Sequence, residues 1–260
     1  MLVWQFPANI FCLFKDVMIL TYLFDGSIMK PYLQYHGFDW TVKGIEKKNG
    51  RYYLTDYTDN KEVIERSKDL ITIYDNAKAN NYKNKSLSKS WYKTNKSKTD
   101  MEQLKKYLSN YFKNHLKAKA TDILWTCPKE YMDLLKGAGY TMIRRLQPEE
   151  KKLSAKEREK IEKQLSCFLP CNARATNDFK ERSVLAYCSN MYLNPYIKRY
   201  FEKKNLQDGT KIEVNEDLFA LSCMVQWIWR SQIRDGKPIS VYIPSMRMRQ
   251  LFNDWLNLKK

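Results

Sequence analysis

The chain has 260 residues, of which 43% are hydrophobic and 14% aromatic, so it can fold around a substantial core and is not a disordered chain. Its 46 Lys and Arg residues outnumber its 29 Asp and Glu residues, which gives a formal net charge of +17. This excess favours a polyanionic partner. Because the charges are spread among polar residues instead of lining one apolar helix, nucleic acid is favoured over a membrane.

The six cysteines and two histidines do not form a metal-binding pattern. Only Cys167 and Cys171 lie close together in sequence, whereas a zinc site requires four clustered ligands. We therefore expect no bound metal, and reduced, buried thiols in a cytoplasmic protein. Pro7, Lys15 and Asp16 interrupt the apolar N-terminus, so neither a signal peptide nor a membrane-spanning helix is expected.

The first 75 residues are predicted to begin an α/β fold. The pattern favours a short helix over Phe6–Phe14 and a buried parallel strand over the apolar run Val17–Phe24. Asp25-Gly26-Ser27 is a turn that can cap a helix over Ile28–Tyr35. A strand, a turn and a helix in this order form the unit from which α/β sheets are built.

A β-hairpin is predicted next. Residues 38–45 and 51–57 alternate between apolar and polar residues on either side of Asn49-Gly50, which is the strongest short-range hairpin signal. Leu70–Tyr74 is a further strand candidate.

The most basic part of the chain follows, with twelve Lys and no Arg from Asn76 to Lys119 against two acidic residues. Its first part, Ala77–Lys98, is rich in Asn, Lys and Ser and is predicted to be a mobile loop. Lys89 and Lys93 flank Trp91, a combination that suits phosphate neutralisation together with base stacking on single strands. The alternative is a solvated linker without a binding role.

Alternating helices and strands are predicted after the basic segment. Residues 101–116 form a helix with apolar residues on one face, 122–127 a strand, 129–135 a helix and 139–143 a short strand. Residues 151–164 alternate in charge, which indicates an exposed helix.

A polar loop at Cys171–Asp178 is a candidate anion-binding site. Asp178 and Glu181 resemble a capping box, so we predict a helix from about Phe179 to Met191. A loop between the end of a strand and a helix N-terminus favours anions in α/β folds. The loop offers the side chains of Asn172, Arg174, Thr176 and Asn177. The alternative is an ordinary helix-capping loop.

The segment Leu218–Trp255 contains the second candidate site. Apolar spacing predicts a helix through Arg234, on which Gln226, Arg230 and Arg234 share one face. Asp235-Gly236-Lys237-Pro238 ends this helix, and a strand over residues 239–243 and a helix over 246–258 follow. The alternative is a solvated helix face that carries two arginines by chance.

These segments resemble the second RecA-like domain of superfamily 2 (DEAD/DEAH-like) helicases, above all those of phages and mobile genetic elements. Gln226-Trp227-Ile228-Trp229-Arg230 resembles motif VI, whose pattern is Gln-x-x-Gly-Arg-x-x-Arg, although Trp229 replaces the Gly and Arg234 comes one residue late. The string Asn172–Asn177 resembles motif V but lacks its usual Thr and Gly-x-Asp. Ile19–Phe24, with Thr21, resembles motif III.

The resemblance implies a mostly parallel RecA-like sheet flanked by helices, with the hairpin as a small insertion. It divides the chain into residues 1–75, a basic loop at 76–100 and a main domain at 101–260. It also implies that Arg230 and Arg234, with Gln226, reach the phosphates of ATP. The motif V residues and Thr21 would contact DNA or nucleotide.

The chain lacks the phosphate loop and the Asp-Glu pair that such helicases need for ATP and Mg²⁺. The resemblance therefore implies a helicase half that binds ATP and Mg²⁺ only when an N-terminal RecA-like domain or subunit supplies these motifs, and that is not active alone. The alternative is a non-enzymatic accessory protein that binds DNA or RNA. A nuclease or hydrolase has no support, because no paired carboxylates or clustered histidines stand out.

Overall fold

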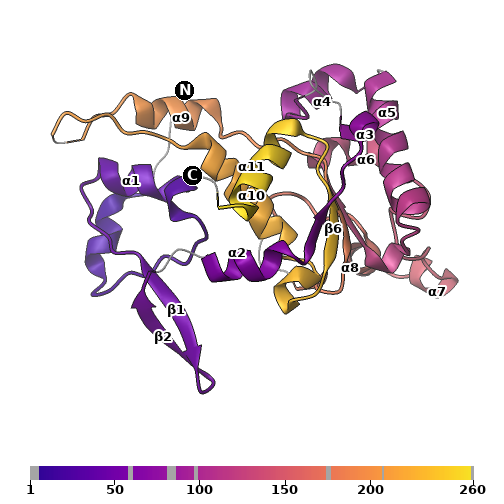
Figure 1. Ribbon diagram of the computed structural model, residues 1–260, viewed down its shortest axis with the longest axis horizontal. Coiled ribbons are helices and arrows are strands. Elements are labelled where there is room, and N and C mark those ends of the chain that lie inside the picture. Colours follow the sequence, from indigo (N-terminus) through magenta and orange to yellow (C-terminus); the bar gives the residue numbers. More distant parts are fainter. Residues whose placement is uncertain are drawn as a thin grey trace. The chain divides into compact units, whose positions relative to one another are not determined.

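The computed structural model describes residues 6–57, 61–80, 86–96, 99–173, 177–206 and 208–258 (Figure 1). The chain forms two compact units. The smaller unit consists of Met1–Tyr57 and Leu193–Ser222, and the larger of Thr58–Tyr192 and Cys223–Lys260. In the described ranges, no helix combines the length and apolar content that crossing a membrane requires.

The larger unit is built on a four-stranded parallel sheet. Its strands are β3 (Ile71–Ile73), β4 (Ile123–Thr126), β5 (Val184–Tyr187) and β6 (Ile239–Tyr242), in the spatial order β3-β6-β5-β4. All four residues of β4 are buried, as are nearly all those of β5 and β6. Burial on both faces explains why β4 and β5 are nearly continuous apolar runs, whereas the edge strand β3 leaves Thr72 exposed.

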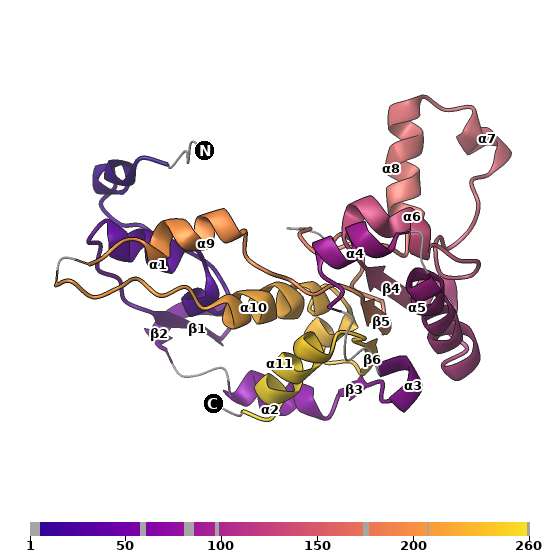
Figure 2. The same cartoon turned by 90° about the horizontal axis from the view of Figure 1, so that it is seen from above.

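Helices cover both faces of this sheet. The helix α5 (Thr99–Ser109) continues into a π-helical turn (Asn110–His115) and lies on one side, while α11 (Met246–Leu256) and the C-terminal half of α10 (Glu216–Ile228) lie on the other (Figures 1 and 2). The remaining helices of the unit are α2 (Lys61–Lys68), α3 (Ala77–Asn80), α4 (Lys89–Asn95), α6 (Met132–Leu135), α7 (Pro148–Lys151) and α8 (Ala155–Leu165). Short 3-10 turns are formed by Ala120–Asp122, Lys129–Tyr131 and Gln232–Asp235.

Buried aromatic side chains fill the space between α5 and the sheet, and their polar tips have partners. The Trp125 indole donates to the Tyr140 carbonyl at 2.8 Å, and the Tyr242 hydroxyl to the Ala79 carbonyl at 2.7 Å. The Tyr111 hydroxyl donates to Ser240 Oγ at 3.0 Å. These contacts let large rings be buried without the cost of an unsatisfied polar group.

The smaller unit combines short helices with a β-hairpin. It contains 3-10 turns at Ala8–Leu13 and Phe24–Gly26, helices α1 (Met29–Tyr35) and α9 (Pro195–Glu202), the strands β1 (Lys43–Lys48) and β2 (Arg51–Asp56), and the N-terminal half of α10. Tyr32, Leu33, Phe201 and Ile212 form its buried core. Asn49 and Gly50 both have positive φ, at 50° and 78°, as a two-residue hairpin turn requires.

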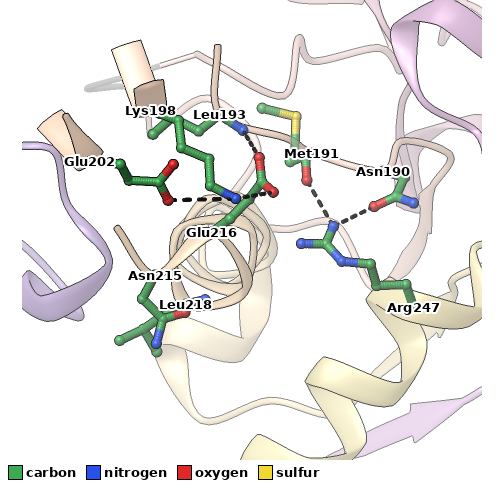
Figure 3. A network of polar contacts seen from close by, with 9 residues as sticks. All are labelled: Asn190, Met191, Leu193, Lys198, Glu202, Asn215, Glu216, Leu218 and Arg247. Atoms are coloured by element: carbon green, nitrogen blue, oxygen red, sulfur yellow. Dashed lines mark hydrogen bonds and ion pairs between the residues drawn. The ribbon is translucent and has the colours of Figure 1, made fainter. Parts of the chain in front are cut away.

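Polar side chains fasten α10 to the chain around α9 within this unit. Glu216 accepts a hydrogen bond from the Leu193 amide at 3.1 Å and pairs with Lys198 at 3.4 Å (Figure 3). The Asn215 side chain accepts the Leu218 amide at 2.8 Å, which caps the start of α10. The Ser222 hydroxyl donates to the Tyr22 carbonyl at 2.8 Å.

The predicted α/β class, the parallel sheet flanked by helices and the hairpin are confirmed. Two predicted strands are wrong. Val17–Phe24 is irregular up to its 3-10 turn, with Leu20 82% exposed, because an apolar run becomes a parallel strand only where a neighbouring strand accepts its backbone hydrogen bonds. Residues 139–143 form turns, and Met142 alone makes an isolated bridge with Ser166.

The predicted mobile loop over Ala77–Lys98 is also partly wrong. It contains α3 and α4, and the N-terminus of α4 is capped by Ser88, whose hydroxyl accepts the Trp91 amide at 3.2 Å. Residues 81–85 and 97–98 of this segment lie outside the described residues.

Candidate functional site

The helix predicted through Arg234 ends earlier, at Ile228. The Ser231 hydroxyl and amide both donate to the Ile228 carbonyl, at 2.7 and 3.0 Å, and so close the chain into a turn. A separate 3-10 turn then contains Arg234. The prediction that Gln226, Arg230 and Arg234 share one face of a single helix is therefore wrong. Gln226 lies exposed on α10, and Arg230 is half-buried in the turn.

Trp227 anchors the end of α10 to the larger unit. Its indole donates to the Leu169 carbonyl at 3.0 Å, and its ring packs edge-on against Tyr187 of β5, with 5.4 Å between the ring centroids. Because the Trp227 ring is almost fully buried, this anchor fixes where the turn with Arg230 begins.

The segments that resembled motifs V and VI contact each other through Arg234 and Asn177. Arg234 Nη1 donates to Asn177 Oδ1 at 2.7 Å, and both side chains are exposed. The backbone N–H of Gln232, two residues before Arg234, donates to the Arg182 carbonyl at 3.0 Å. The Arg234–Asn177 pair lies at the amino ends of β5 and β6, because the residues that follow it enter these two strands.

The loop at 171–178 lies in a different setting from the one predicted. No helix begins at Phe179, because residues 178–181 form a turn and Val184–Tyr187 is the central strand β5. The loop therefore does not lead into a helix N-terminus. Asn172 is exposed, three residues after the carbonyl that accepts Trp227, while Arg174 and Thr176 lie outside the described residues.

Arg182 is a structural residue that the sequence analysis missed. It is 5% exposed, and its guanidinium donates to the carbonyls of Ala120, at 3.0 Å, and Thr121. Burial lowers the pKa of Arg182 from its ordinary value, because desolvation disfavours the charged form. The guanidinium thereby connects the segment just before β5 to the segment just before β4.

The basic segment presents its lysines on packed helices. The buried face of α5 and its π-turn consists of Leu104, Leu108, Tyr111 and Phe112, all fully buried. The described lysines of this segment are all exposed, and they are Lys78, Lys89, Lys93, Lys96, Lys105, Lys106, Lys113, Lys117 and Lys119. Lys89 pairs with Glu130 at 2.7 Å, and this hydrogen bond lowers the pKa of the Glu130 carboxyl.

Trp91 is 8% exposed, with its ring edge-on to Tyr92, whose hydroxyl donates to the Cys188 carbonyl at 2.6 Å. The Trp91 ring therefore lies in the core and not on a surface that a base could reach, which corrects its predicted stacking role. Thr21 is exposed in an irregular segment of the smaller unit and not at the end of a strand.

The carboxyl ends of β5 and β6 carry a polar network that the sequence analysis missed. Arg247, in the first turn of α11, donates to Asn190 Oδ1 at 2.7 Å and to the Met191 carbonyl at 2.9 Å (Figure 3). Its guanidinium also lies 4.5 Å from the centre of the Tyr192 ring. The sequence signals this network only weakly, through the polar residues Asn190 and Arg247, each of which follows an apolar run by a few residues.

The cysteines of the larger unit belong mainly to its core. Cys127, Cys167 and Cys188 are fully buried, and burial raises the pKa of each thiol, that of Cys167 to about 11. Among the residues that the structure describes, no group of three or more His, Cys, Asp or Glu side chains could hold a metal ion.

Comparison with known proteins matches residues 65–256 to the model of the YonV C-terminal Rossmann-like domain. The chain is also 38% identical, over 262 aligned positions, to the SPbeta prophage-derived uncharacterized protein YonV of Bacillus subtilis (strain 168). That alignment covers 98% of this chain and 55% of the relative, so the chain spans about half the relative's length. No solved structure matches the chain.

Replacing Arg182 with Met should destabilise the larger unit. The change leaves the Ala120 and Thr121 carbonyls without their donor, and we expect the free energy of unfolding to fall by about 1–3 kcal/mol. Urea unfolding followed by tryptophan fluorescence measures this difference. Lys180→Met, an exposed change two residues away, is the control, and equal stability of the two variants would contradict the role of Arg182.

Thiol alkylation should separate the exposed cysteine from the buried ones. Because only the thiolate reacts and burial raises the pKa of Cys127, Cys167 and Cys188, these thiols should resist iodoacetamide in the folded protein near neutral pH. Cys12 is exposed and should react first. Mass spectrometry of tryptic peptides before and after urea treatment gives the order of labelling. Labelling of Cys127 before Cys12 would contradict the packing around β4.

Proposed function

The chain belongs to the family of the YonV C-terminal Rossmann-like domain, and we propose from its surface that the protein binds nucleic acid. DNA is the expected ligand, and RNA is the alternative. The observation that carries the proposal is the set of exposed lysines on α4, α5 and the π-turn, within a segment that supplies ten of the seventeen net positive charges.

The packing of this segment supports a binding role over that of a solvated linker. The lysines lie on helices whose opposite faces are fully buried, so the positive charges are held on a fixed surface. A phosphate backbone that follows this surface gains from the release of its condensed counterions. Lysine acts as a point charge, so binding of this kind discriminates little between sequences.

The roles of the individual residues differ from the pattern that the sequence suggested. Lys93 is exposed on α4 and is the proposed phosphate contact there, whereas Lys89 is held by Glu130 and Trp91 is buried. Phosphate contacts, and not stacking on Trp91, therefore carry the proposed binding at this surface.

A second candidate function is that of a helicase half. Two observations favour it: Arg234 contacts Asn177, which joins the two helicase-like segments, and the Bacillus relative has nearly half its length beyond the matched region. In this proposal an N-terminal RecA-like domain or subunit supplies the phosphate loop and holds ATP and Mg²⁺. Although they do not share one helix face, Arg230, Arg234 and Gln226 would then each reach the nucleotide from a separate position, and the loop with Asn172 and Asn177 would face the DNA.

The nucleic-acid proposal predicts a strong dependence of affinity on salt. Affinity for a labelled oligonucleotide, measured by fluorescence anisotropy, should fall roughly tenfold or more between about 50 and 200 mM salt. Replacing Lys105, Lys106 and Lys113 together with Gln should weaken binding and make the slope of log affinity against log salt shallower by about 2–3.

The matched control changes Lys156, Lys160 and Lys163 to Gln, which removes the same charge from the exposed helix α8. An equal loss of affinity in both triple variants would show that net charge alone, and not the α5 surface, attracts the ligand. Salt-independent binding, or no binding, would contradict the proposed function.

The helicase proposal predicts that this chain completes an ATPase. A partner polypeptide with the phosphate loop and the Asp-Glu pair should gain DNA-stimulated ATP hydrolysis when mixed with the chain, because the guanidinium of Arg230 stabilises the charge on the transferred phosphate. Arg230→Ala should remove this gain, and Arg199→Ala, an exposed change on α9, should not. Unchanged hydrolysis by the Arg230 variant would exclude this role.

A further inference from the structure

The hairpin of the smaller unit lies outside the matched family region and is exposed along its length. Within the described residues, β1 and β2 pair only with each other. Every residue of the two strands is exposed except Gly44 and Thr55, which are half-buried. In Figure 1 the hairpin extends away from α1 and α9 of the same unit. An exposed ribbon with free edges is shaped to contact a ligand.

One face of this ribbon combines an aromatic ring with cations and apolar side chains. Tyr52 is 71% exposed, an unusual exposure for so large a ring, and lies opposite Lys47 in the strand register. The Lys47 ammonium is 5.5 Å from the centre of the ring. Ile45 and Leu54, which are opposite each other on the same face, are 60% and 59% exposed.

The charge near the turn is positive. Lys47, Lys48 and Arg51 lie within three residues of the Asn49-Gly50 turn, against Glu46 alone. Glu46 is engaged by Lys48 at 2.9 Å. Of these cations, Lys47 lies on the Tyr52 face, whereas the register partners Lys48 and Arg51 lie on the opposite face. The Tyr52 face thus offers the Lys47 ammonium for a phosphate beside a ring on which a base can stack, and Asp56 on this face is engaged by Lys43 at 2.8 Å.

We infer that the Tyr52 face of the β1–β2 hairpin is a second nucleic-acid contact, which binds single-stranded nucleic acid by stacking a base on Tyr52 beside the phosphate-binding cation Lys47. This inference rests on the proposed nucleic-acid binding. It assigns a preference for single-stranded over double-stranded nucleic acid to a surface separate from α5. A base that stacks on the ring replaces the Lys47 ammonium, which stays close enough to bind the adjoining phosphate.

A single strand fits this face better than a duplex. The faces of the bases are free only where the strand is not paired and stacked, and stacking on an aromatic side chain tolerates any base. Ile45 and Leu54 extend the apolar surface beside the ring, while the lysines of α5 bind only backbone charge.

The test compares Tyr52→Thr with Tyr52→Phe in the full chain. Thr retains the preference for a strand but removes the ring, whereas Phe retains the ring. With a labelled oligothymidine in fluorescence anisotropy, Tyr52→Thr should weaken binding on the order of tenfold without changing the salt slope, and Tyr52→Phe should bind like the wild type. Affinity for a duplex of the same length should stay within about twofold of the wild type, because its bases are not free to stack.

Photo-crosslinking with an oligonucleotide that contains 5-iodouracil provides an independent readout, since it joins the base directly to a nearby ring. We expect the crosslinked peptide to contain Tyr52. If the wild type binds with the salt dependence expected for the α5 lysines but Tyr52→Thr binds equally well and the crosslink lies elsewhere, the hairpin inference is wrong and the proposed function stands. If the wild type binds no oligonucleotide, both are wrong.

Discussion

The larger unit depends on a sheet of four short parallel strands, of which β4, β5 and β6 are almost entirely buried. Such a sheet has no face that can be left to water, so its backbone groups must find partners in neighbouring strands and its side chains in covering helices. The helix α5 covers one face and α11 with the end of α10 the other. Because the strands are only three or four residues long, large aromatic side chains provide much of the packing between these layers.

This requirement determines where polar groups can lie. Within the core, several large polar groups are bound, as with the Trp125 indole, the Tyr242 hydroxyl and the Arg182 guanidinium. Charged groups that could bind a ligand are displaced to the ends of the strands and to the outer faces of the helices. The Arg234–Asn177 contact lies at the amino ends of the strands, and the Arg247 network lies at the carboxyl ends.

The same separation of buried apolar groups from exposed charged groups explains why lysines that contribute to the net charge of +17 lie together on a surface. The apolar stripe of α5 faces the sheet, so its lysines are left on the opposite side, where they are spaced by the helix itself. The hairpin also carries cationic side chains on its surface, although it has no core of its own. Since nearly all residues of its two strands are exposed, rings and cations remain on the surface together. The two surfaces differ in chemistry, because α5 offers charge whereas the hairpin offers charge and an exposed ring.

The sequence alone determined the features that depend on local geometry or composition. Asn49-Gly50 requires a hairpin turn, Gly236 ends its segment with a φ of 68°, and the periodicity of residues 101–116 specifies a helix. The tertiary structure decided the features that depend on distant partners. Val184–Tyr187 and Val17–Phe24 are both short apolar runs, but only the first has strands on both sides to accept its hydrogen bonds. Trp91 was expected among solvated lysines, yet its ring is buried beside Tyr92, and the turn at Ile228 follows from the anchoring of Trp227 on Leu169 and Tyr187. The residues of a short apolar run do not specify which segments will pack beside it, so only the tertiary structure determines whether the run becomes a strand.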